Sequence, residues 1–506
     1  MFVPGEQRTI RLQQASDLAA RSIAMLGVGG AGMSALARLL ASMGAAVRGF
    51  DAVASPITDR LISEGLSVSI GDGHDAADAA EVLVATAAVP ESHPALARAG
   101  TLGVPVLRYP EALGLVMEGR TGVAVAGTHG KSTTVAMLGV AMVDAGLDPS
   151  VIAGAACAQL AHGALGPSGP WAGSRLGAST IPSGPRFGRP GLLVAEACEF
   201  NRSFHNLHPT IAGIGNVEAD HLDIYGSLDA VVEAFGHFAR SLPPAEEGGV
   251  LIIGHDGAHR REVAAGVSAR VQTIGFSPEA DWVIRYQQDA HQTEVAHRDG
   301  AWGRWQQRMP GAHNAANAGM AFALACASGG DPTVVARSLG AFGGLERRCQ
   351  VLADRPVQGG TVRVYDDYGH HPTEVDATLR AIRHAERPQA NGGRLIVVFQ
   401  PHQHSRTRFL LDEFATAFSS ADQVIVPEIY FVRDSEAEKQ RVSAGDLVQR
   451  LRDRGVRSDH VHPFTTIVEQ LEQDCRPGDV VVVMGAGPVW QVAHGFAFGD
   501  RAVAHA

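Results

Sequence analysis

The sequence contains few cysteines, almost no lysine and no long apolar run. Its five cysteines are scattered and form no CxxC pair, which indicates neither a disulfide framework nor a cysteine-rich metal site. No run of about 18 apolar residues is present, and the first twenty residues lack a basic start followed by an apolar core. We therefore expect a cytoplasmic protein without membrane insertion. A net charge of −11 argues against nucleic-acid binding by the chain as a whole.

Lysine is scarcer than cysteine: of the 42 lysines and arginines, only Lys131 and Lys439 are lysines. Lys131 lies in the turn GTHGKST at 127–133, between an apolar run at 123–126 and an apolar helical pattern. In such a strand, turn and helix, glycines let backbone N–H groups close on phosphate oxygens, the ammonium reaches the outer phosphates and a hydroxyl can hold Mg²⁺. A compact ammonium fits a slot that a planar guanidinium does not.

The turn predicts a binding site for a nucleoside triphosphate. It is a shorter variant of the general pattern, which has glycine where this chain has Val125, and a surface turn without function is the alternative. The residues expected to bind the triphosphate are Gly127, Thr128, His129, Gly130, Lys131, Ser132 and Thr133.

A second glycine turn lies near the beginning of the chain. A strand is predicted at 22–26, residues 27–32 are GVGGAG, 33–43 have helical apolar spacing, and a strand at 47–50 ends at Asp51. Taken alone, this pattern favours NAD; a nucleotide-sugar pyrophosphate and a purely structural turn are the alternatives, and the second nucleotide motif at Lys131 weakens the NAD interpretation. With apolar strands at 82–85 and 104–107, residues 1–120 are predicted to form one parallel α/β domain.

A length of 506 residues, 45% of them hydrophobic, predicts about three domains. The second, 121–343, contains the turn at Lys131 and strands at 192–199 and 211–215. Glu196 lies near the end of the first of these strands, and Asp220, His221 and Asp223 follow the second. All four are candidates for holding Mg²⁺, with solvated turn or helix-start residues as the alternative. A stretch rich in Gly, Pro and Ser at 165–190 is expected to be a flexible loop, either inert or a lid.

The remaining candidates lie in the last third of the chain. A helix is predicted to open at 311–318, where His313, Asn314 and Asn317 suit either hydrogen bonds to adenine or ribose, or helix capping. A junction with two arginines at 343–348 precedes the third predicted domain, 344–506. Its strands are expected at 362–365, 395–399, 424–426 and 480–483, with polar residues at the strand ends, where open sheets bind ligands.

These motifs occur in the order seen in the Mur ligases, which essentially the whole chain resembles. They are the first glycine turn, GTHGKST, NxEADHLDxY, GxHNxxNA, GLERR, DDYGHHPTEV and FQPHxxSRTR. DDYGHHPTE and QPHxxSRTR resemble the branch of the family that adds L-alanine. The resemblance implies an α/β fold with three domains: a Rossmann-like N-terminal domain for the UDP-sugar, a central P-loop ATPase domain, and a C-terminal Rossmann-like α/β domain that recruits the amino acid.

The resemblance also implies a reaction: ATP, with Mg²⁺, phosphorylates the carboxylate of UDP-N-acetylmuramate, and L-alanine displaces the phosphate. The implied catalytic residues are Lys131, His221, His371 and Arg406. The implied metal ligands are Ser132, Glu196 and His221, and the nucleotide site also includes His313, Asn314, Asn317 and Arg347. The implied UDP-sugar-binding residues are Gly29, Gly30, Ala31, Gly32, Met33, Ser34 and Asp51. The implied amino-acid-binding residues are Tyr368, His371, His402 and Arg406.

Two positions depart from the family pattern. Cys198 stands where an acid is usual, and Gln403 stands where a cation is usual. Other branches resemble one another in using a carbamylated lysine in the central domain, and this chain has no lysine between 132 and 438, which is typical of the alanine-adding branch. The rival interpretations are a ligase that adds a preformed peptide to the same sugar nucleotide, an NAD-dependent oxidoreductase, and a non-catalytic UDP-sugar sensor.

Overall fold

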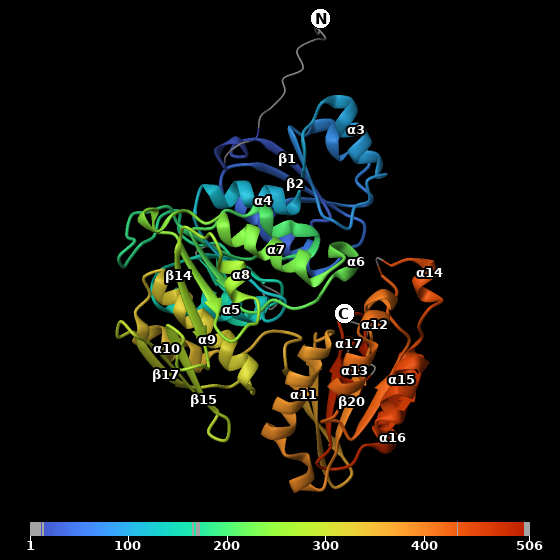
Figure 1. The fold of residues 1–506 in the computed structure, drawn as a ribbon. Coiled ribbons are helices and arrows are strands. Elements are labelled where there is room, and N and C mark those ends of the chain that lie inside the picture. Colours follow the sequence, from blue (N-terminus) through green and yellow to red (C-terminus); the bar gives the residue numbers. More distant parts are fainter. Residues whose placement is uncertain (1–11, 13–14, 164–165, 168–172, 433, 500–506) are drawn as a thin grey trace, which may run out of the picture. The chain divides into compact units, whose positions relative to one another are not determined.

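The computed structural model describes residues 12, 15–163, 166–167, 173–432 and 434–499 (Figure 1). The chain divides into two compact units. Unit 1 consists of Met1–Arg285, Glu294–Trp305 and Ala316–Phe342, and unit 2 consists of Tyr286–Thr293, Gln306–Ala315 and Gly343–Ala506. Both are built from strands that alternate with helices, as the sequence predicts for an α/β protein.

The first sheet of unit 1 has five parallel strands in the order β3-β2-β1-β4-β5. The strands are β1 Ser22–Leu26, β2 Ala46–Asp51, β3 Ser67–Ile70, β4 Val82–Ala85 and β5 Val106–Arg108. The helical elements are η1 Ala15–Asp17, α1 Ala31–Ser42, α2 Pro56–Ser63, η2 Ala76–Ala79, α3 Pro94–Leu102 and α4 Tyr109–Glu118. β5 begins two residues later than expected, because the N–H of Val104 bonds to the preceding helix and Pro105 has no N–H to give.

The second sheet has ten strands in the order β10-β7-β11-β6-β12-β13-β14-β15-β16-β17. The strands are β6 Thr121–Ala126, β7 Ser150–Ile152, β10 Ser174–Arg175, β11 Leu192–Glu196, β12 Ile211–Ile214, β13 Val250–Gly254, β14 Arg270–Gly275, β15 Trp282–Gln287, β16 Gln292–His297 and β17 Trp302–Gln306. The helical elements of this region are α5 Lys131–Asp144, η3 Ala158–Ala161, η4 Phe200–Asn206, α6 Leu222–Tyr225, α7 Leu228–Arg240, η5 Ala245–Glu247, α8 Arg260–Ala264, α9 Ala312–Ala327 and α10 Pro332–Ala341. β8 His162–Gly163 and β9 Gly166–Pro167 form a separate pair.

The stretch predicted as a loop at 165–190 is only partly described. Residues 165 and 168–172 lie outside the described part, whereas Ser174 and Arg175 form β10, which pairs antiparallel with β7 at the edge of the ten-stranded sheet. An isolated bridge between Thr180 and Pro190 closes the segment between them. Residues 174–190 are therefore attached to the sheet at both ends, through β10 and through β11, which follows at residue 192.

Unit 2 contains a six-stranded sheet in the order β18-β19-β23-β20-β21-β22, in which only the β18–β19 pair is antiparallel. The strands are β18 Gln350–Val357, β19 Gly360–Asp367, β20 Leu395–Phe399, β21 Gln423–Val426, β22 Ser458–His460 and β23 Val480–Met484. The helical elements are α11 Pro372–Glu386, η6 Pro388–Asn391, α12 His404–Phe409, α13 Leu411–Ala417, α14 Glu436–Lys439, α15 Ala444–Asp453, α16 Phe464–Asp474 and α17 Trp490–Phe498. Two separate apolar cores cover the two faces of this sheet.

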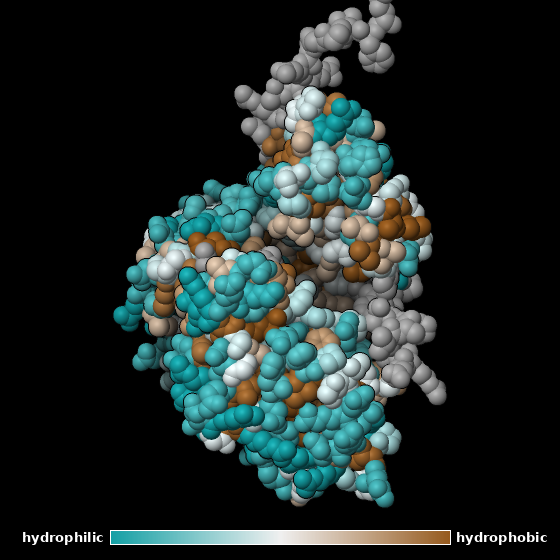
Figure 2. Space-filling model, turned by 90° about the vertical axis from the view of Figure 1, so that its right-hand side faces the viewer, coloured by the Kyte–Doolittle hydropathy of each residue, from teal (hydrophilic) through white to brown (hydrophobic). Residues whose placement is uncertain are grey.

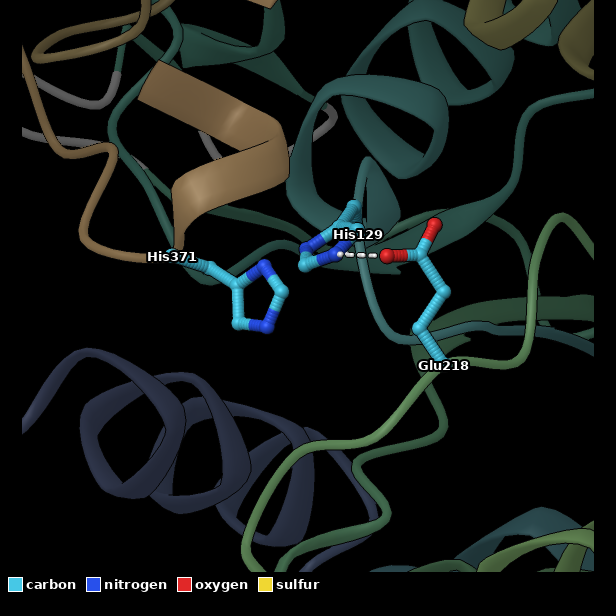
Figure 3. Close-up of side chains that lie close together, drawn as sticks. All are labelled: His129, Glu218 and His371. Atoms are coloured by element: carbon cyan, nitrogen blue, oxygen red, sulfur yellow. Dashed lines mark ion pairs between the residues drawn. The ribbon is translucent and has the colours of Figure 1, made fainter. Parts of the chain in front are cut away.

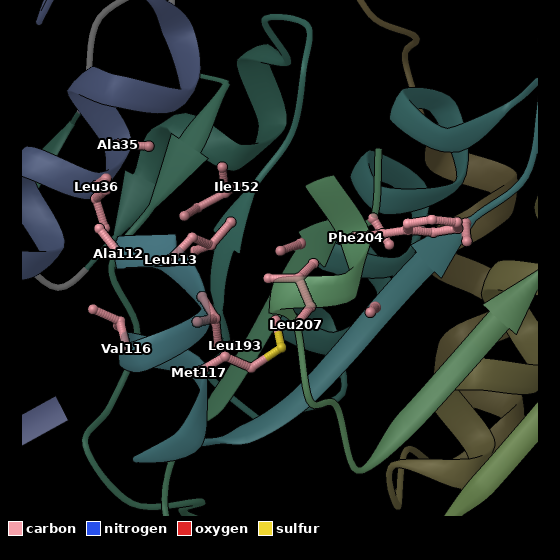
Figure 4. Close-up of a cluster of buried hydrophobic side chains, with 14 of the residues drawn as sticks. Ala35, Leu36, Ala112, Leu113, Val116, Met117, Ile152, Leu193, Phe204 and Leu207 are labelled. Carbon is pink, nitrogen blue, oxygen red and sulfur yellow. The ribbon is translucent and has the colours of Figure 1, made fainter. Parts of the chain in front are cut away.

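One continuous core joins the two sheets of unit 1 (Figure 4). Leu113 and Met117 of α4 belong to the same buried cluster as Leu193 of β11 and Phe204 of η4. A Cβ at Gly114 of α4 would lie 2.0 Å from the carbonyl oxygen of Asn206, so glycine is required for this close approach. Each buried Leu or Phe contributes about 1.5–3 kcal/mol. The first and second sheets are therefore parts of one packed unit.

The surface in Figure 2 is mainly hydrophilic, with small apolar areas between the polar ones. In the described part of the chain, no helix has the length and apolar character needed to cross a membrane.

Candidate active site

The turn at Lys131 lies between β6 and α5, in the middle of the ten-stranded sheet. Gly127 and Gly130 have φ of 142° and 80°, which residues with side chains rarely adopt. A Cβ at Gly130 would also lie 2.2 Å from Asn317 Oδ1. Ser132 and Thr133 follow, both buried, in the first turn of α5. The predicted strand, turn and helix are therefore present, and the turn leads into a helix N-terminus, which attracts anions.

The segment after β12 holds this turn in place. Asn216 Oδ1 accepts the backbone N–H of His129 at 2.8 Å, and Asn216 Nδ2 donates to the His129 carbonyl at 3.3 Å. The hydroxyl of Thr128 accepts the N–H of Glu218 at 2.9 Å. Figure 3 shows the His129 ring beside Glu218, with 3.4 Å between Nε2 and Oε2. The backbone of His129 thus forms the turn, while its side chain pairs with the neighbouring loop.

Lys131 is held by a buried carboxylate and two backbone carbonyls. Its Nζ donates to the carbonyls of Gly127 and Thr128 at 2.6 and 3.1 Å, and lies 2.8 Å from Glu199 Oε2. The side chains of Lys131 and Glu199 are 14% and 4% exposed. Burial lowers the pKa of Lys131, but Glu199 and the other acidic groups nearby outweigh it, so the net pKa lies above its usual value. The ammonium is therefore charged at physiological pH, as phosphate binding requires.

Glu199 belongs to a cluster in unit 1 that has the composition of a metal site. The ligand atoms of Glu199, Asp220 and His221 lie within 4.8 Å of one another. Glu196, the carboxylate predicted as a metal ligand, is not a member of this group, and its Oε1 accepts the N–H of Gly154. β11 ends at Glu196, after which the chain turns and brings Glu199 to Lys131. Carboxylate oxygens and an imidazole suit a hard divalent cation such as Mg²⁺.

The backbone around Glu199 is held in an unusual conformation. Tyr225 Oη donates to the Glu199 carbonyl at 2.5 Å, and the Arg202 guanidinium lies 4.8 Å from the centre of the Tyr225 ring. Asn201, Arg202 and His221 have φ between 50° and 53°, in the left-handed region. Such conformations persist only where surrounding contacts enforce them, and they concentrate at functional sites. Tyr225 therefore helps to position Glu199 through its backbone.

The predicted nucleotide-binding residues of α9 have different surroundings. Asn317 Oδ1 accepts the hydroxyl of Thr134 at 3.4 Å, so this asparagine packs against the helix that follows the turn. Asn314 is buried, and its Nδ2 donates to the Pro310 carbonyl at 2.9 Å, which is a bond near the start of its own helix. Burial lowers the pKa of His313 to about 4, so its ring is neutral at pH 7.

The first glycine turn is stabilised by Asp51. Asp51 Oδ2 accepts the N–H of Gly29 at 2.8 Å, so the predicted sugar-binding acid holds the turn itself. A Cβ at Gly32 would lie 2.8 Å from the Tyr109 ring, which shows that this glycine permits close helix packing. Met33 is buried in the core shared by the two sheets. The other predicted sugar-binding residues cap or begin α1: Gly30, Ala31 and Ser34.

In unit 2, Arg347 is bound by the ends of neighbouring strands. Its Nη2 donates to the carbonyls of Gly485 and Gly487 at 2.6 and 3.3 Å, and its Nε lies 3.4 Å from Asp366 Oδ2. Its guanidinium also lies 5.2 Å from the centre of the Tyr368 ring. Arg347, predicted to reach nucleotide phosphates, therefore has four partners within its own unit.

Asp366 and Asp367 end β19 as adjacent buried carboxylates. Burial raises the pKa of Asp366 to about 6, and Arg347 partly opposes the rise. Burial likewise raises the pKa of Asp367 to about 6 against the charge of Arg348, although Asp367 accepts the N–H groups of Cys349 and Gly369 at 2.6 and 2.7 Å. Two carboxylates at the end of one strand thus titrate close to neutral pH.

The predicted amino-acid-binding residues are also found in unit 2. His371 caps α11, where its Nδ1 accepts the N–H of Thr373 at 3.3 Å. The His402 ring lies 5.7 Å from that of Tyr430, and the backbones of these two residues form a bridge. Arg406 lies on α12 with only 7% of its surface exposed. A buried arginine is suited to binding a carboxylate through two parallel hydrogen bonds.

The two departures from the family pattern have structural consequences. Gln403 has φ of 67° and donates from its side chain to the Val432 carbonyl at 3.3 Å. The Gln403 side chain therefore stabilises the loop before α12. Cys198 is exposed at the surface, but its crowded surroundings and Glu199 raise the pKa of its thiol to about 11. The thiol is neutral at pH 7 and does not replace the charge of an acid.

Three further residues contribute to the site. Asp220, which the sequence left open as a metal ligand or a solvated turn residue, completes the metal-type cluster with Glu199, and Asn216 fastens the turn at Lys131. All three follow strands of the sheet that carries Lys131, and this position was the available signal. Their distances from the turn depend on how the chain bends after each strand, which residue spacing does not reveal.

The fold and this site define a nucleotide-binding α/β enzyme of several domains. Three family descriptions match successive parts of the chain: Mur ligase family, catalytic domain, at 22–121; Mur ligase middle domain, at 125–325; and Mur ligase, glutamate ligase domain, at 347–487. The chain belongs to the Mur ligase family.

Individual relatives cover almost all of the chain. A UDP-N-acetylmuramate–L-alanine ligase of Kineococcus radiotolerans is 40% identical over 478 residues, which are 92% of this chain and 94% of the relative. The protein of the same name from Sorangium cellulosum is 37% identical over 473 residues, 93% of this chain and 94% of the relative. A solved UDP-N-acetylmuramate-alanine ligase from Thermotoga maritima superposes with a TM-score of 0.72 at 23% identity, covering 94% of this chain and 98% of that one, and supports the fold.

Proposed function

We propose that this protein is an ATP-dependent ligase that joins L-alanine to the carboxylate of UDP-N-acetylmuramate, a step in the synthesis of peptidoglycan precursors in the cytoplasm. The observation that carries the proposal is the 40% identity, over 92% of the chain, with an enzyme named for this reaction. The charged, buried Lys131 in its glycine turn supports the nucleotide requirement.

The chemistry explains why a nucleoside triphosphate is needed. A carboxylate resists attack by an amine because its leaving group would be oxide. Transfer of the terminal phosphoryl group of ATP to the carboxylate gives an acyl phosphate and ADP. The amino group of L-alanine then attacks the acyl carbon, phosphate leaves, and the amide forms with loss of a proton from nitrogen.

Lys131 has the position and charge to bind the transferring phosphoryl group. Its present partners are Glu199 and two carbonyls, and phosphate oxygens would take the place of Glu199. Glu199, Asp220 and His221, with the hydroxyl of Ser132, are the proposed ligands of Mg²⁺. A bound Mg²⁺ would neutralise charge on the phosphoryl group.

The UDP-sugar is proposed to bind at the N-terminus of α1, where Gly29, Gly30 and Gly32 keep the turn compact. Arg406 is proposed to pair with the carboxylate of L-alanine, with Tyr368, His371 and His402 as further contacts. The domain boundaries proposed are 1–120 for the UDP-sugar, 121–343 for ATP and 344–506 for the amino acid.

The test is ADP release by the purified protein with ATP, Mg²⁺ and UDP-N-acetylmuramate. L-Alanine is compared with glycine, L-serine, an L-alanyl peptide and no addition. Release that requires L-alanine supports the proposal and shows that Gln403 is compatible with it. Release only with the peptide would assign the protein to peptide recycling, and no release with any acceptor would leave a sugar-nucleotide sensor.

A further inference from the structure

A cavity with polar and apolar lining residues lies in unit 1, away from the turn at Lys131. Its volume is about 320 Å³, within the lower part of the range for small-molecule sites. It is bordered by the beginnings of β13 and β14, by η5 and by the end of α9. The strands of this part of the sheet run parallel to β6, so their beginnings lie at the edge opposite to the one from which the Lys131 turn emerges.

The floor of the cavity is formed by three side chains from neighbouring strands, Gln272 of β14, Trp282 of β15 and His297 of β16, which contact one another. Trp282 Nε1 donates to Gln272 Oε1 at 3.3 Å, and Gln272 Nε2 lies 3.1 Å from His297 Nε2. The rings of Trp282 and His297 are 4.3 Å apart, and both side chains are almost fully buried. Because each member is held by its neighbour, the floor is rigid and presents an aromatic and amide surface.

The walls carry positive charge that protein carboxylates do not balance. Arg186 and Arg270 line the cavity, and in the described part of the chain neither has a carboxylate within ion-pair distance. Arg186 Nη2 donates a long hydrogen bond, 3.5 Å, to the Gly248 carbonyl. Burial and the neighbouring Arg189 lower the pKa of Arg186 below its usual value, as expected for like charges held together.

Negative groups also border the cavity. Glu246 and Glu247 of η5 lie between the lining residues Ala245 and Gly248, and Arg270 is exposed, so water screens its charge. Asp299 also lines the cavity, but its side chain is 79% exposed and lies 3.6 Å from His297, so water screens its charge. The end of α9, at Cys326 and Ala327, contributes about half a negative charge. Among the lining residues two arginines face one aspartate, so the lining carries a net positive charge.

We propose that this cavity binds a small phosphorylated molecule with a compact planar or apolar body. A dianionic phosphate monoester matches the two guanidinium groups better than a monocarboxylate does. The body would lie over the Trp282 and Gln272 floor, beside the small side chains of Ala245, Ala301 and Ala327. The site is distinct from the proposed ATP site and does not depend on the ligase reaction.

The test uses the full-length chain with Lys131→Ala, which removes the phosphate grip of the other site. Phenyl phosphate, inorganic phosphate and phenol are titrated by calorimetry without Mg²⁺. Phenyl phosphate is expected to bind one per chain, more tightly than inorganic phosphate, while phenol does not bind. Arg186→Gln with Arg270→Gln should weaken that binding at least about tenfold, since each charged hydrogen bond is worth about 1.5–3 kcal/mol.

Arg98→Gln serves as the matched control, because Arg98 is a half-exposed arginine whose partner is Asp78, outside the cavity. The Arg98→Gln variant should bind phenyl phosphate as tightly as the Lys131→Ala chain without it. Absence of phenyl phosphate binding, or binding that the double arginine variant leaves unchanged, would overturn the proposal. Circular dichroism of each variant shows whether it is folded. If the double variant unfolds, Trp282→Leu with phenyl phosphate provides the second test, and unchanged affinity there also contradicts the site.

Discussion

The ion pair between Lys131 and Glu199 leads to a quantitative prediction. Their charged atoms are 2.8 Å apart and their side chains 14% and 4% exposed. Removing one member of a buried pair costs about 3–5 kcal/mol, because the other charge stays buried. For Glu199→Gln we expect the lower end, about 3 kcal/mol, since Lys131 keeps the carbonyls of Gly127 and Thr128.

A double-mutant cycle separates the pair from its surroundings. Lys131→Met, Glu199→Gln and the double variant are compared without nucleotide, and the opening free energy of α5 is measured by amide hydrogen exchange. The double variant should be less destabilised than the sum of the single variants, with a coupling energy of about 2–4 kcal/mol. Glu196→Gln is the matched control, because this nearby carboxylate contacts Gly154. A coupling below about 0.5 kcal/mol would refute the buried pair.

Three further predictions concern activity and pH. Glu199→Gln should raise the Mg²⁺ concentration for half-maximal ADP release about tenfold or more, and Glu196→Gln should change it little. The reverse order would support the sequence prediction of Glu196 as the ligand. Burial raises the pKa of Asp366 from 3.8 to about 6, so this carboxyl group lowers the free energy of unfolding of unit 2 as the pH rises from about 4 to above 6. Asp366→Asn should reduce this fall, measured by urea unfolding across that pH range, by about 3 kcal/mol. An unchanged dependence of the unfolding free energy on pH would exclude Asp366 as the cause. Arg406→Ala should raise the apparent KM for L-alanine about 100-fold with little change for ATP, and an effect confined to ATP would contradict the assignment.

Much of the fold was predictable because strands and helices leave local signals. Continuous apolar runs identified β1, β4 and β20 with their observed ends, and the glycine turn before Lys131 identified the strand and helix on either side. Such signals depend on residues close together in the chain, where the strand and helix periodicities act. The boundaries that shifted, such as that of β5, depend on hydrogen bonds to other elements.

The site was predictable in part for the same reason. The sequence alone determined that a charged lysine sits in a glycine turn, that acidic residues follow the neighbouring strands, and that the chain is a Mur ligase by its ordered motifs. It did not distinguish Glu196 from Glu199, because both lie near the end of one strand.

Only the tertiary structure decided which groups meet. The chain turns after β11, so that Glu199 reaches Lys131 while Glu196 binds Gly154. The same holds for Arg186 and Arg270, which are 84 residues apart and share one cavity. A contact between distant segments depends on side-chain packing and on backbone conformations such as the left-handed Asn201, and neither leaves a pattern in the local sequence.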